Sequence, residues 1–289
     1  MKHLMPHLPS DRLHALIAGT DLPLEDSGSV LFADLAGFTP LTERLFHDFG
    51  ARRGAETLTD LLDAVYAPLI ATVHAHGGSV ISFSGDAITC WFSGADPRSA
   101  ISCGLAMQQA MGPFAAYRLA SDTQVSLTLK VAIAAGPVQR FVVGDPAIQR
   151  IDILAGAPLA RLAMLDLLAL PGEVVVDAPL ARALGDALSV AAWRGDAGGD
   201  LGAVVIRLRS AASYMSAPSS MAVDRLPDLT AWVTPAVRAR LEDPQAAFFT
   251  ELRPIVALFL RFGGVIDPAS LDSYIREVQQ ILGRYDATP

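Results

Sequence analysis

The chain has 289 residues, of which 52% are apolar and 18% are charged, and its formal net charge is −8 at pH 7. This balance supplies ample material for a hydrophobic core and excludes a disordered chain. The length allows one large domain and a smaller unit. A surface for nucleic acid would need a cluster of basic residues, so the acidic balance indicates that no nucleic acid is bound.

The cysteines and the N-terminus indicate where the protein is found. Cys90 and Cys103 lie in apolar or helical contexts. Two cysteines cannot form a disulfide framework, so we expect two buried thiols in a reducing compartment. Residues 1–16 lack the long uncharged core of a signal peptide, and no window of about 18 residues is apolar and unbroken by charge. The sequence therefore predicts a cytoplasmic protein without a membrane partner.

Strands and helices are predicted in alternation from residue 28. Residues 1–27 form a polar lead-in, and a buried strand at 30–34 ends in an acid. Thr39 and Pro40 are predicted as the N-cap and first residue of a helix that runs to Phe49. After a basic turn at 51–54, apolar residues at spacings of three and four predict a longer helix over 56–76.

The following segments complete one domain, 28–209. A hairpin is expected from strands at 79–83 and 87–92, with Ser84-Gly85-Asp86 at its tip. The later elements are a helix at 97–119, strands at 125–135, 140–143 and 151–154, a helix at 158–169, and strands at 173–176, 188–194 and 203–209. This order is that of an α+β, ferredoxin-like split βαβ unit, with helices on one face of a mainly antiparallel sheet. The other face, or the sheet end, would stay open.

The last eighty residues are predicted to hold a linker and part of a repeat. Residues 210–250 are assigned to the linker, which includes a helical stretch at 228–241. Residues 255–259 resemble the strand at 30–32, and a helical pattern runs over 270–285. Residues 251–289 are therefore interpreted as the truncated start of a second copy of the domain.

Two acids are the main candidates for chemistry. Asp34 ends one strand and Asp86 lies at the tip of a hairpin, so in a ferredoxin-like sheet they come from neighbouring central strands. Two carboxylates there could hold two Mg²⁺ or Mn²⁺ ions, which bind few protein ligands and take the rest from phosphates and water. The alternative is that each acid only caps a turn.

The strand-to-helix turn after Asp34 is the second candidate. Gly37 allows a close approach of the backbone to a ligand, and free amides at a helix start bind phosphate. Because this turn follows Asp34 directly, residues 35–39 are predicted to form a phosphate cradle beside a metal ligand.

Two stretches resemble the metal motifs of class III adenylate and guanylate cyclases: FADLAGFTPLTE (32–43) and GGSVISFSGDAITCWF (77–92). Within that family the pattern is most similar to the soluble adenylyl cyclases and their bacterial relatives, which carry two cyclase domains in tandem. The resemblance implies that Asp34 and Asp86 hold two metal ions. It also implies that the Leu35 carbonyl is a further ligand, and that the amides of Gly37, Phe38 and Thr39 bind the β- and γ-phosphates.

The chain departs from the family at four positions. Family members that act as homodimers have a lysine where this chain has Ser82, and an adenine-reading residue where it has Ile153. They have an asparagine and an arginine where it has Ala160 and Met164. Asp152 lies one position from the base-reading place, and Arg161 could replace the bicarbonate-binding lysine of related cyclases only in part. In the predicted second copy, Arg261 stands where the metal acid would be.

These matches and departures imply an adenylate cyclase domain that supplies the metal-binding half of a composite site. It would convert ATP to cyclic AMP and pyrophosphate, as part of intracellular signalling. The second cyclase domain, in the same longer chain or in another subunit, would supply the missing groups, so residues 1–289 alone should be nearly inactive. The alternatives are a non-catalytic nucleotide-sensing or partner-binding module, and a structural dimerisation domain.

Overall fold

The computed structural model describes residues 2–94, 96–118, 124–209, 227–243, 256, 258, 260, 263 and 267–285. Its contacts divide the chain into two compact units. The larger unit comprises Glu25–Val138 and Ala155–Met221, and the smaller comprises Met1–Leu24, Gln139–Leu154 and Ala222–Pro289. Both units contribute to one long strand, β6 (Thr128–Val143).

The larger unit contains the predicted strand and hairpin. β1 (Glu25–Ala36) pairs antiparallel with β3 (Ala87–Ser93), which pairs antiparallel with β2 (Ser79–Ser84). The tip of the β2–β3 hairpin is Gly85-Asp86, with Gly85 at a φ of 64°. The sheet continues from β1 to β6, β8 (Val174–Asp177), β10 (Gly199–Leu208) and β9 (Leu188–Asp196). The predicted hairpin is confirmed, whereas β1 is longer than the predicted 30–34 strand.

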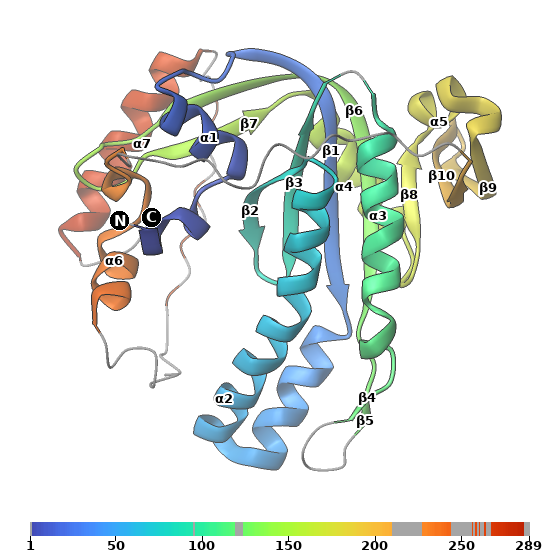
Figure 1. Ribbon diagram of the computed structural model, residues 1–289, viewed down its shortest axis with the longest axis horizontal. Coiled ribbons are helices and arrows are strands. Elements are labelled where there is room, and N and C mark those ends of the chain that lie inside the picture. Colours follow the sequence, from blue (N-terminus) through green and yellow to red (C-terminus); the bar gives the residue numbers. More distant parts are fainter. Residues whose placement is uncertain are drawn as a thin grey trace. The chain divides into compact units, whose positions relative to one another are not determined.

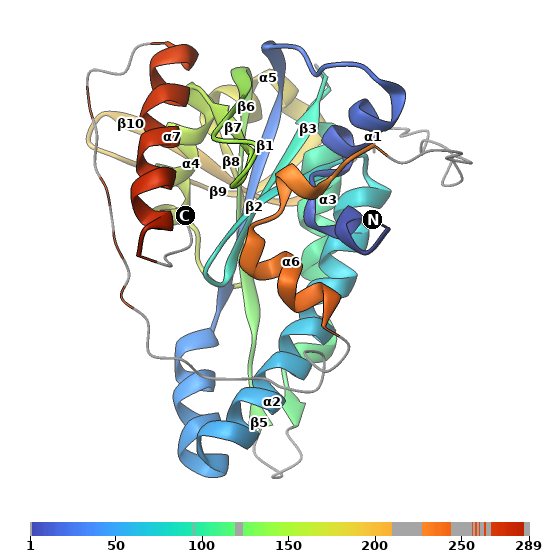
Figure 2. The same cartoon turned by 90° about the vertical axis from the view of Figure 1, so that its left-hand side faces the viewer.

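α2 (Phe38–Ala75) corrects the two predicted helices and the turn between them. It reverses direction at Gly50, whose φ of 72° and ψ of 177° are not helical, and its two halves lie side by side (Figures 1 and 2). The turn is thus one glycine, and the predicted turn at 51–54 is helical. The N-cap is Gly37 rather than Thr39, which lies inside the helix. A positive φ is accessible to glycine without strain, which explains both positions.

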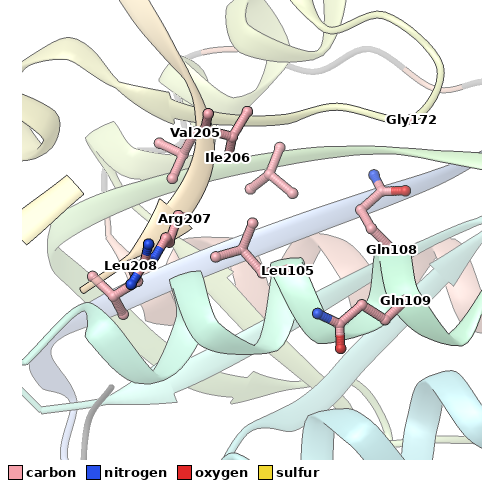
Figure 3. Close-up of a pocket in the computed structure, with 9 residues that line it drawn as sticks. Leu105, Gln108, Gln109, Gly172, Val205, Ile206, Arg207 and Leu208 are labelled. Carbon is pink, nitrogen blue, oxygen red and sulfur yellow. The ribbon is translucent and has the colours of Figure 1, made fainter. Parts of the chain in front are cut away.

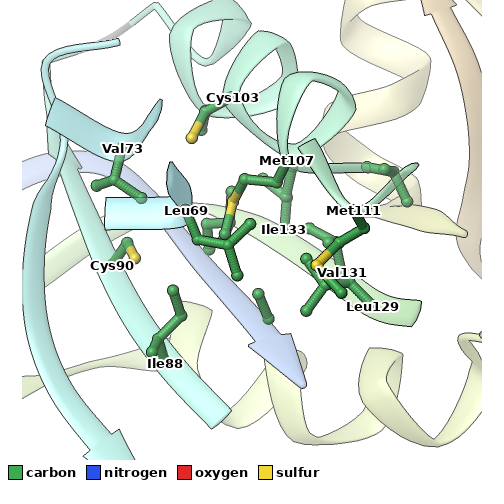
Figure 4. Packing of buried hydrophobic residues seen from close by; sticks show 14 of the residues in the cluster. Leu69, Val73, Ile88, Cys90, Cys103, Met107, Met111, Leu129, Val131 and Ile133 are labelled. Carbon is green, nitrogen blue, oxygen red and sulfur yellow. The ribbon is translucent and has the colours of Figure 1, made fainter. Parts of the chain in front are cut away.

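The main core lies between the sheet and α2 together with α3 (Arg98–Ala110). Alternating strand residues face these helices, as Figure 4 shows for buried side chains of both layers. Those labelled are Leu69, Val73, Ile88, Cys90, Cys103, Met107, Met111, Leu129, Val131 and Ile133. Both cysteines are free and buried, as predicted, and burial raises the pKa of each thiol. α3 is shorter than the predicted 97–119 helix.

The sequence predicted that the second face of the sheet, or the sheet end, would stay open, and in the structure a helix covers part of that face. On this face α4 (Ala157–Leu168) packs against β1 and β8. Leu165 of α4 and Val175 of β8 meet at Gly202, whereas Val174 and Val176 belong to the core on the α3 side. Alternation along the strands separates the two faces.

The remaining elements of the larger unit are short or lie at its margins. They are η2 (Gly112–Phe114), β4 (Tyr117–Arg118), β5 (Gln124–Val125), α5 (Ala178–Leu184) and η3 (Gly185–Ala187). β6 continues through Gly136 and Pro137, where the sequence predicted an end, so the predicted strands at 125–135 and 140–143 belong largely to one strand.

The smaller unit contains helical segments within the predicted lead-in, residues 1–27. It contains η1 (Lys2–His7) and α1 (Ser10–Ala18), the end of β6, most of β7 (Ile151–Ala155), η4 (Thr230–Trp232), α6 (Pro235–Glu242) and α7 (Pro268–Gly283). Apolar residues of η1 and α1 pack with Leu229, Trp232 and Val233 in a core of their own.

A truncated second copy is not shown among the described residues. Within 251–289 they include one helix, α7, and Val256 and Leu258 lie in no strand; the rest of the expected strand and Arg261 fall outside the described part. Asp272 accepts a hydrogen bond from the Gly144 N–H (2.8 Å), and Gln279 accepts one from the Asp145 N–H (2.7 Å). α7 therefore belongs to the smaller unit with the β6–β7 connection (Figure 2).

Most of the predicted linker also lies outside the described residues. In the part of the chain that the structure describes, none of the helices is both long enough and apolar enough to cross a membrane.

Candidate functional site

Asp34 and Asp86 lie on neighbouring strands at one end of the sheet. Asp34 pairs in register with Ala87, the residue after Asp86. The Leu35 N–H donates a hydrogen bond to the Asp86 carbonyl oxygen at 3.3 Å. Paired strands are about 5 Å apart, so the backbones that carry the two carboxylates are adjacent, as the sequence predicted.

Tyr66 of α2 adds a hydroxyl to this end of the sheet. Its Oη donates a hydrogen bond to the Asp86 carbonyl oxygen at 2.8 Å, and its ring lies edge-on to Phe83 with centroids 5.8 Å apart. Burial and the charges of Asp86 and Asp34 raise the pKa of Tyr66 to about 12. Both carboxylates thus lie close enough to this hydroxyl to act on it, and Tyr66 stays a neutral donor that holds the hairpin tip.

Lys130 of β6 supplies the cation of the site. Its Nζ lies 2.9 Å from Asp34 Oδ2 and 2.9 Å from Asp166 Oδ1 of α4. Desolvation opposes the charge, but the hydrogen bonds to Asp34 and Asp166 raise the pKa of Lys130 above its ordinary value. The three side chains are between 21% and 26% exposed, so solvent and ligands can reach them.

The turn after Asp34 presents backbone donors. Gly37 has a φ of 95°, and a Cβ added there would lie 2.6 Å from the Ser126 carbonyl oxygen. The first helical hydrogen bond of α2 runs from the Leu41 N–H to the Gly37 carbonyl (3.2 Å). The earlier amides of Phe38 and Thr39 have no carbonyl one turn before them and point out of the helix start. They can therefore receive an anion.

The residues at this sheet end fit a divalent cation bound together with a phosphorylated ligand. Among the described residues no group of three or more His, Cys, Asp or Glu side chains forms a complete protein cage. Mg²⁺ commonly takes only one or two carboxylates and completes its shell with water and phosphates. The Asp34 carboxylate is already paired with a cation, the Lys130 ammonium. The position beside this carboxylate is therefore one where a positive charge is stabilised.

Other residues named from the sequence lie elsewhere or have other partners. Asp152, in the smaller unit, is bound by Arg12 and Arg140 at 2.9 Å each, with 5% of its side chain exposed. Arg161 of α4 pairs with Asp177 (2.8 Å) and donates to the Ala135 carbonyl (2.5 Å). Met164, also on α4, is 51% exposed.

The family model of the adenylate and guanylate cyclase catalytic domain matches residues 22–184, which is more than half of the chain. The chain belongs to this family. The match contains β1, the β2–β3 hairpin and α4, and with them Asp34, Asp86 and Lys130.

Curated relatives of this cyclase domain include adenylate cyclase type 10 of Oryctolagus cuniculus and of Homo sapiens. Each is 27% identical over 124 residues, which is 41% of this chain and 7% of the relative. The chain thus aligns with only a small part of these proteins.

Solved structures give the fold of the cyclase domain. The adenylyl cyclase CyaB from P. aeruginosa matches with a TM-score of 0.52 and 19% identity, covering 64% of this chain and 96% of that one. The guanylyl cyclase Cya2 matches with a TM-score of 0.51 and 20% identity, covering 69% and 98%. At these identities the likeness concerns the fold, and it confirms the predicted mixed α and β cyclase architecture.

Sequence reasoning missed Lys130 and Tyr66. Lys130 is one of two lysines in the chain and stands in the otherwise apolar run Leu129–Ala135. A charge inside a predicted buried strand was therefore a usable signal. Tyr66 gave none, because it continues the apolar spacing of a long helix. Its role depends on the hairpin packed against that helix.

Proposed function

We propose that this cyclase domain converts a nucleoside triphosphate to the cyclic 3′,5′-monophosphate and pyrophosphate, and that its preferred substrate is ATP. The observation that carries the proposal is the pairing of β1 with β3, which brings Asp34 and Asp86 to one sheet end beside the helix start at Gly37. Carboxylates next to free amides provide both ligands for cations and donors for phosphate.

Each residue of the site would have one task. Asp34 and Asp86, with the Leu35 carbonyl, would hold two Mg²⁺ or Mn²⁺ ions. Such ions supply charge that favours ionisation of the ribose 3′-hydroxyl and departure of pyrophosphate. The amides of Gly37, Phe38 and Thr39 would orient the β- and γ-phosphates. Tyr66 would fix the hairpin tip through the Asp86 carbonyl. Catalysis of phosphoryl transfer depends mainly on such positioning and charge.

Lys130 would exchange its pairing with the Asp34 carboxylate for a pairing with a substrate phosphate when the substrate binds. Without substrate its ammonium neutralises Asp34 and Asp166. A cation on Asp34 would repel the ammonium and leave it to pair with a phosphate, while Asp166 keeps it in place.

The choice of ATP rests on the relatives. Adenylate cyclase type 10 is named as an adenylate cyclase, whereas one structural neighbour is a guanylate cyclase domain of RhGC from Catenaria anguillulae in complex with GTP (15% identity, TM-score 0.51). The base-reading place is occupied by Ile153 here, and an apolar side chain cannot read a purine edge by hydrogen bonds. Base selection is therefore assigned to a partner domain.

A second cyclase domain is the expected partner. Ala160 and Met164, where the family has an asparagine and an arginine, lie four residues apart on α4, and Leu167 on the same helix is 79% exposed. Apolar side chains grouped on an exposed helix face favour contact with another protein surface. This partner would supply the lysine, asparagine and arginine that are missing here.

Calorimetry followed by a product assay tests the proposal. We expect the full chain with Mn²⁺ to bind ATP but to form little cyclic AMP alone, because the transition-state groups are absent. Adding a cyclase domain that retains those groups but lacks its own metal acids should restore turnover. A chain that binds no nucleotide with Mn²⁺ would contradict the proposal.

A non-catalytic nucleotide-binding module is the second candidate, favoured by the replacements at Ile153, Ala160 and Met164. The same experiment separates the two, since such a module would bind ATP with Mn²⁺ and form no product with any complementing domain.

Replacing Lys130 should move two affinities in opposite directions. In Lys130→Met we expect Mn²⁺ alone to bind about two- to fivefold more tightly, because a partly exposed ammonium no longer competes for Asp34. Binding of ATP with Mn²⁺ should weaken by a similar factor, because a phosphate partner is lost. Calorimetry measures both, and Lys130→Arg is the control that keeps the charge.

The small number of lysines provides a direct readout of the same exchange. Reductive ¹³C-methylation labels the lysine amines, and Lys130→Arg identifies the Lys130 signal. That signal should shift with Mg²⁺ and again with ATP. The proposed exchange of partners by Lys130 would be wrong if Lys130→Met weakened both Mn²⁺ binding and ATP binding. It would also be wrong if the Lys130 signal shifted with neither Mg²⁺ nor ATP.

A further inference from the structure

A concave site apart from Asp34 and Asp86 lies in the larger unit, between α3, the start of β8 and the end of β10. The cavity has a volume of about 440 Å³ and is open to solvent. This volume falls within the range of sites that bind small molecules in proteins. None of its lining residues belongs to the metal site (Figure 3).

The floor of this cavity is apolar. It is formed by Leu105 of α3, Val174 of β8, and Val205 and Leu208 of β10. Val174 and Val205 are buried parts of the main core, whereas Leu105 and Leu208 are only half-buried at its margin. An apolar group placed here would cover Leu105 and Leu208 and gain the free energy of removing that surface from water.

The polar side chains that line the cavity differ in whether they already form hydrogen bonds within the protein. Gln108 Nε2 donates hydrogen bonds to the carbonyl oxygens of Leu129 (2.9 Å) and Glu173 (3.0 Å), so this side chain is fixed as part of the wall. Arg207 and Gln109 also line the cavity, and their side chains form no hydrogen bond or ion pair with the described residues. Both are exposed.

The Arg207 guanidinium, which has no partner among the residues that the structure describes, determines the charge of a suitable ligand. Arg207 presents donors in a planar fork that matches a carboxylate, and hydrogen bonds between charged groups are the stronger ones. Gln109 adds an amide on the α3 side of the cavity that can bond a polar group of a ligand. Figure 3 shows Arg207 beside Leu208, with Leu105 between these residues and Gln109.

We propose that this cavity binds a small carboxylate with an apolar body, such as an aryl- or alkyl-carboxylate. The apolar body would lie on Leu105 and Leu208, and the carboxylate would pair with Arg207. The site is independent of the proposed cyclase reaction, because it shares no residue with it.

A matched pair of probes tests this site on the full chain. We expect 4-phenylbutyrate to bind saturably in calorimetry and its uncharged analogue 4-phenylbutanol to bind more weakly. Arg207→Gln should weaken 4-phenylbutyrate about tenfold and leave 4-phenylbutanol unchanged, because only the anion uses the guanidinium. Arg209→Gln, an exposed arginine two residues away and outside the lining, is the control and should change neither.

A cavity-filling variant provides a second measurement that does not depend on charge. Gln109 is exposed on α3, so Gln109→Trp should leave folding intact while its indole occupies the cavity mouth. Binding of both probes should then be lost. The proposal is overturned if 4-phenylbutyrate does not saturate, if Arg207→Gln and Arg209→Gln weaken it equally, or if a folded Gln109→Trp binds it normally.

Discussion

Asp34→Asn and Asp86→Asn are each expected to abolish high-affinity binding of Mn²⁺ in the presence of ATP and to lower cyclic AMP formation in the complemented assay by at least about a hundredfold. An amide keeps the shape of the carboxylate but loses the charge that a hard cation requires. Removing one element of charge stabilisation commonly costs this much in phosphoryl and acyl transfer. Calorimetry with Mn²⁺ and ATP, followed by the product assay, measures both losses.

The matched control for these substitutions is Asp63→Asn. Asp63 is exposed on α2, the helix that carries Tyr66, so the same change of charge occurs outside the site. It should leave binding and turnover unchanged. If the Asp34 and Asp86 variants still bound Mn²⁺ and formed product like Asp63→Asn, the two carboxylates would be turn caps and the cyclase proposal would fail.

Asp152→Asn is expected to lower the free energy of unfolding of the smaller unit by about 3 to 5 kcal/mol. Asp152 accepts hydrogen bonds from Arg12 and Arg140, which are each 4% exposed. Arg140 also pairs with Asp11, and Arg12 lies over the Trp232 ring at 5.3 Å. Neutralising Asp152 leaves two buried guanidinium groups with too little negative charge, and an uncompensated buried charge carries a cost of this size.

The effect can be located by hydrogen exchange and compared with an exposed pair. Exchange should accelerate in α1 and at 139–154, the segments that the network joins. Asp200→Asn removes the partner of Arg182, and their side chains are 48% and 57% exposed. That substitution should cost less than about 1 kcal/mol. Equal and small effects would show that the network does not stabilise the unit.

The same network predicts a dependence on pH. Burial by itself would raise the pKa of Asp152, but the hydrogen bonds from Arg140 and Arg12 outweigh it and hold this pKa below its ordinary value. A lowered carboxyl pKa contributes stability above the ordinary value of about 4, and that stability is lost as the pH falls through the folded-state pKa. Asp152→Asn should remove this part of the acid sensitivity.

The sequence by itself determined the local elements of the site. The strand that carries Asp34, the turn at Gly37 and the hairpin tip at Asp86 follow from short patterns. These are an apolar run, a glycine that permits a positive φ, and a turn between two strands. Such patterns act over a few residues. They were therefore readable without knowledge of the rest of the chain.

Only the tertiary structure decided which distant residues join these elements. Lys130 reaches Asp34 and Asp166 because β6 lies between β1 and β8, and because α4 packs on the second face of the sheet against these strands. Asp152, a near miss for base recognition in the sequence, is instead enclosed by arginines from α1 and β6. α7 joins the β6–β7 connection through Asp272 and Gln279. Pairings between separate elements of the chain leave no periodic signal, because they depend on strand order and helix placement rather than on local propensity.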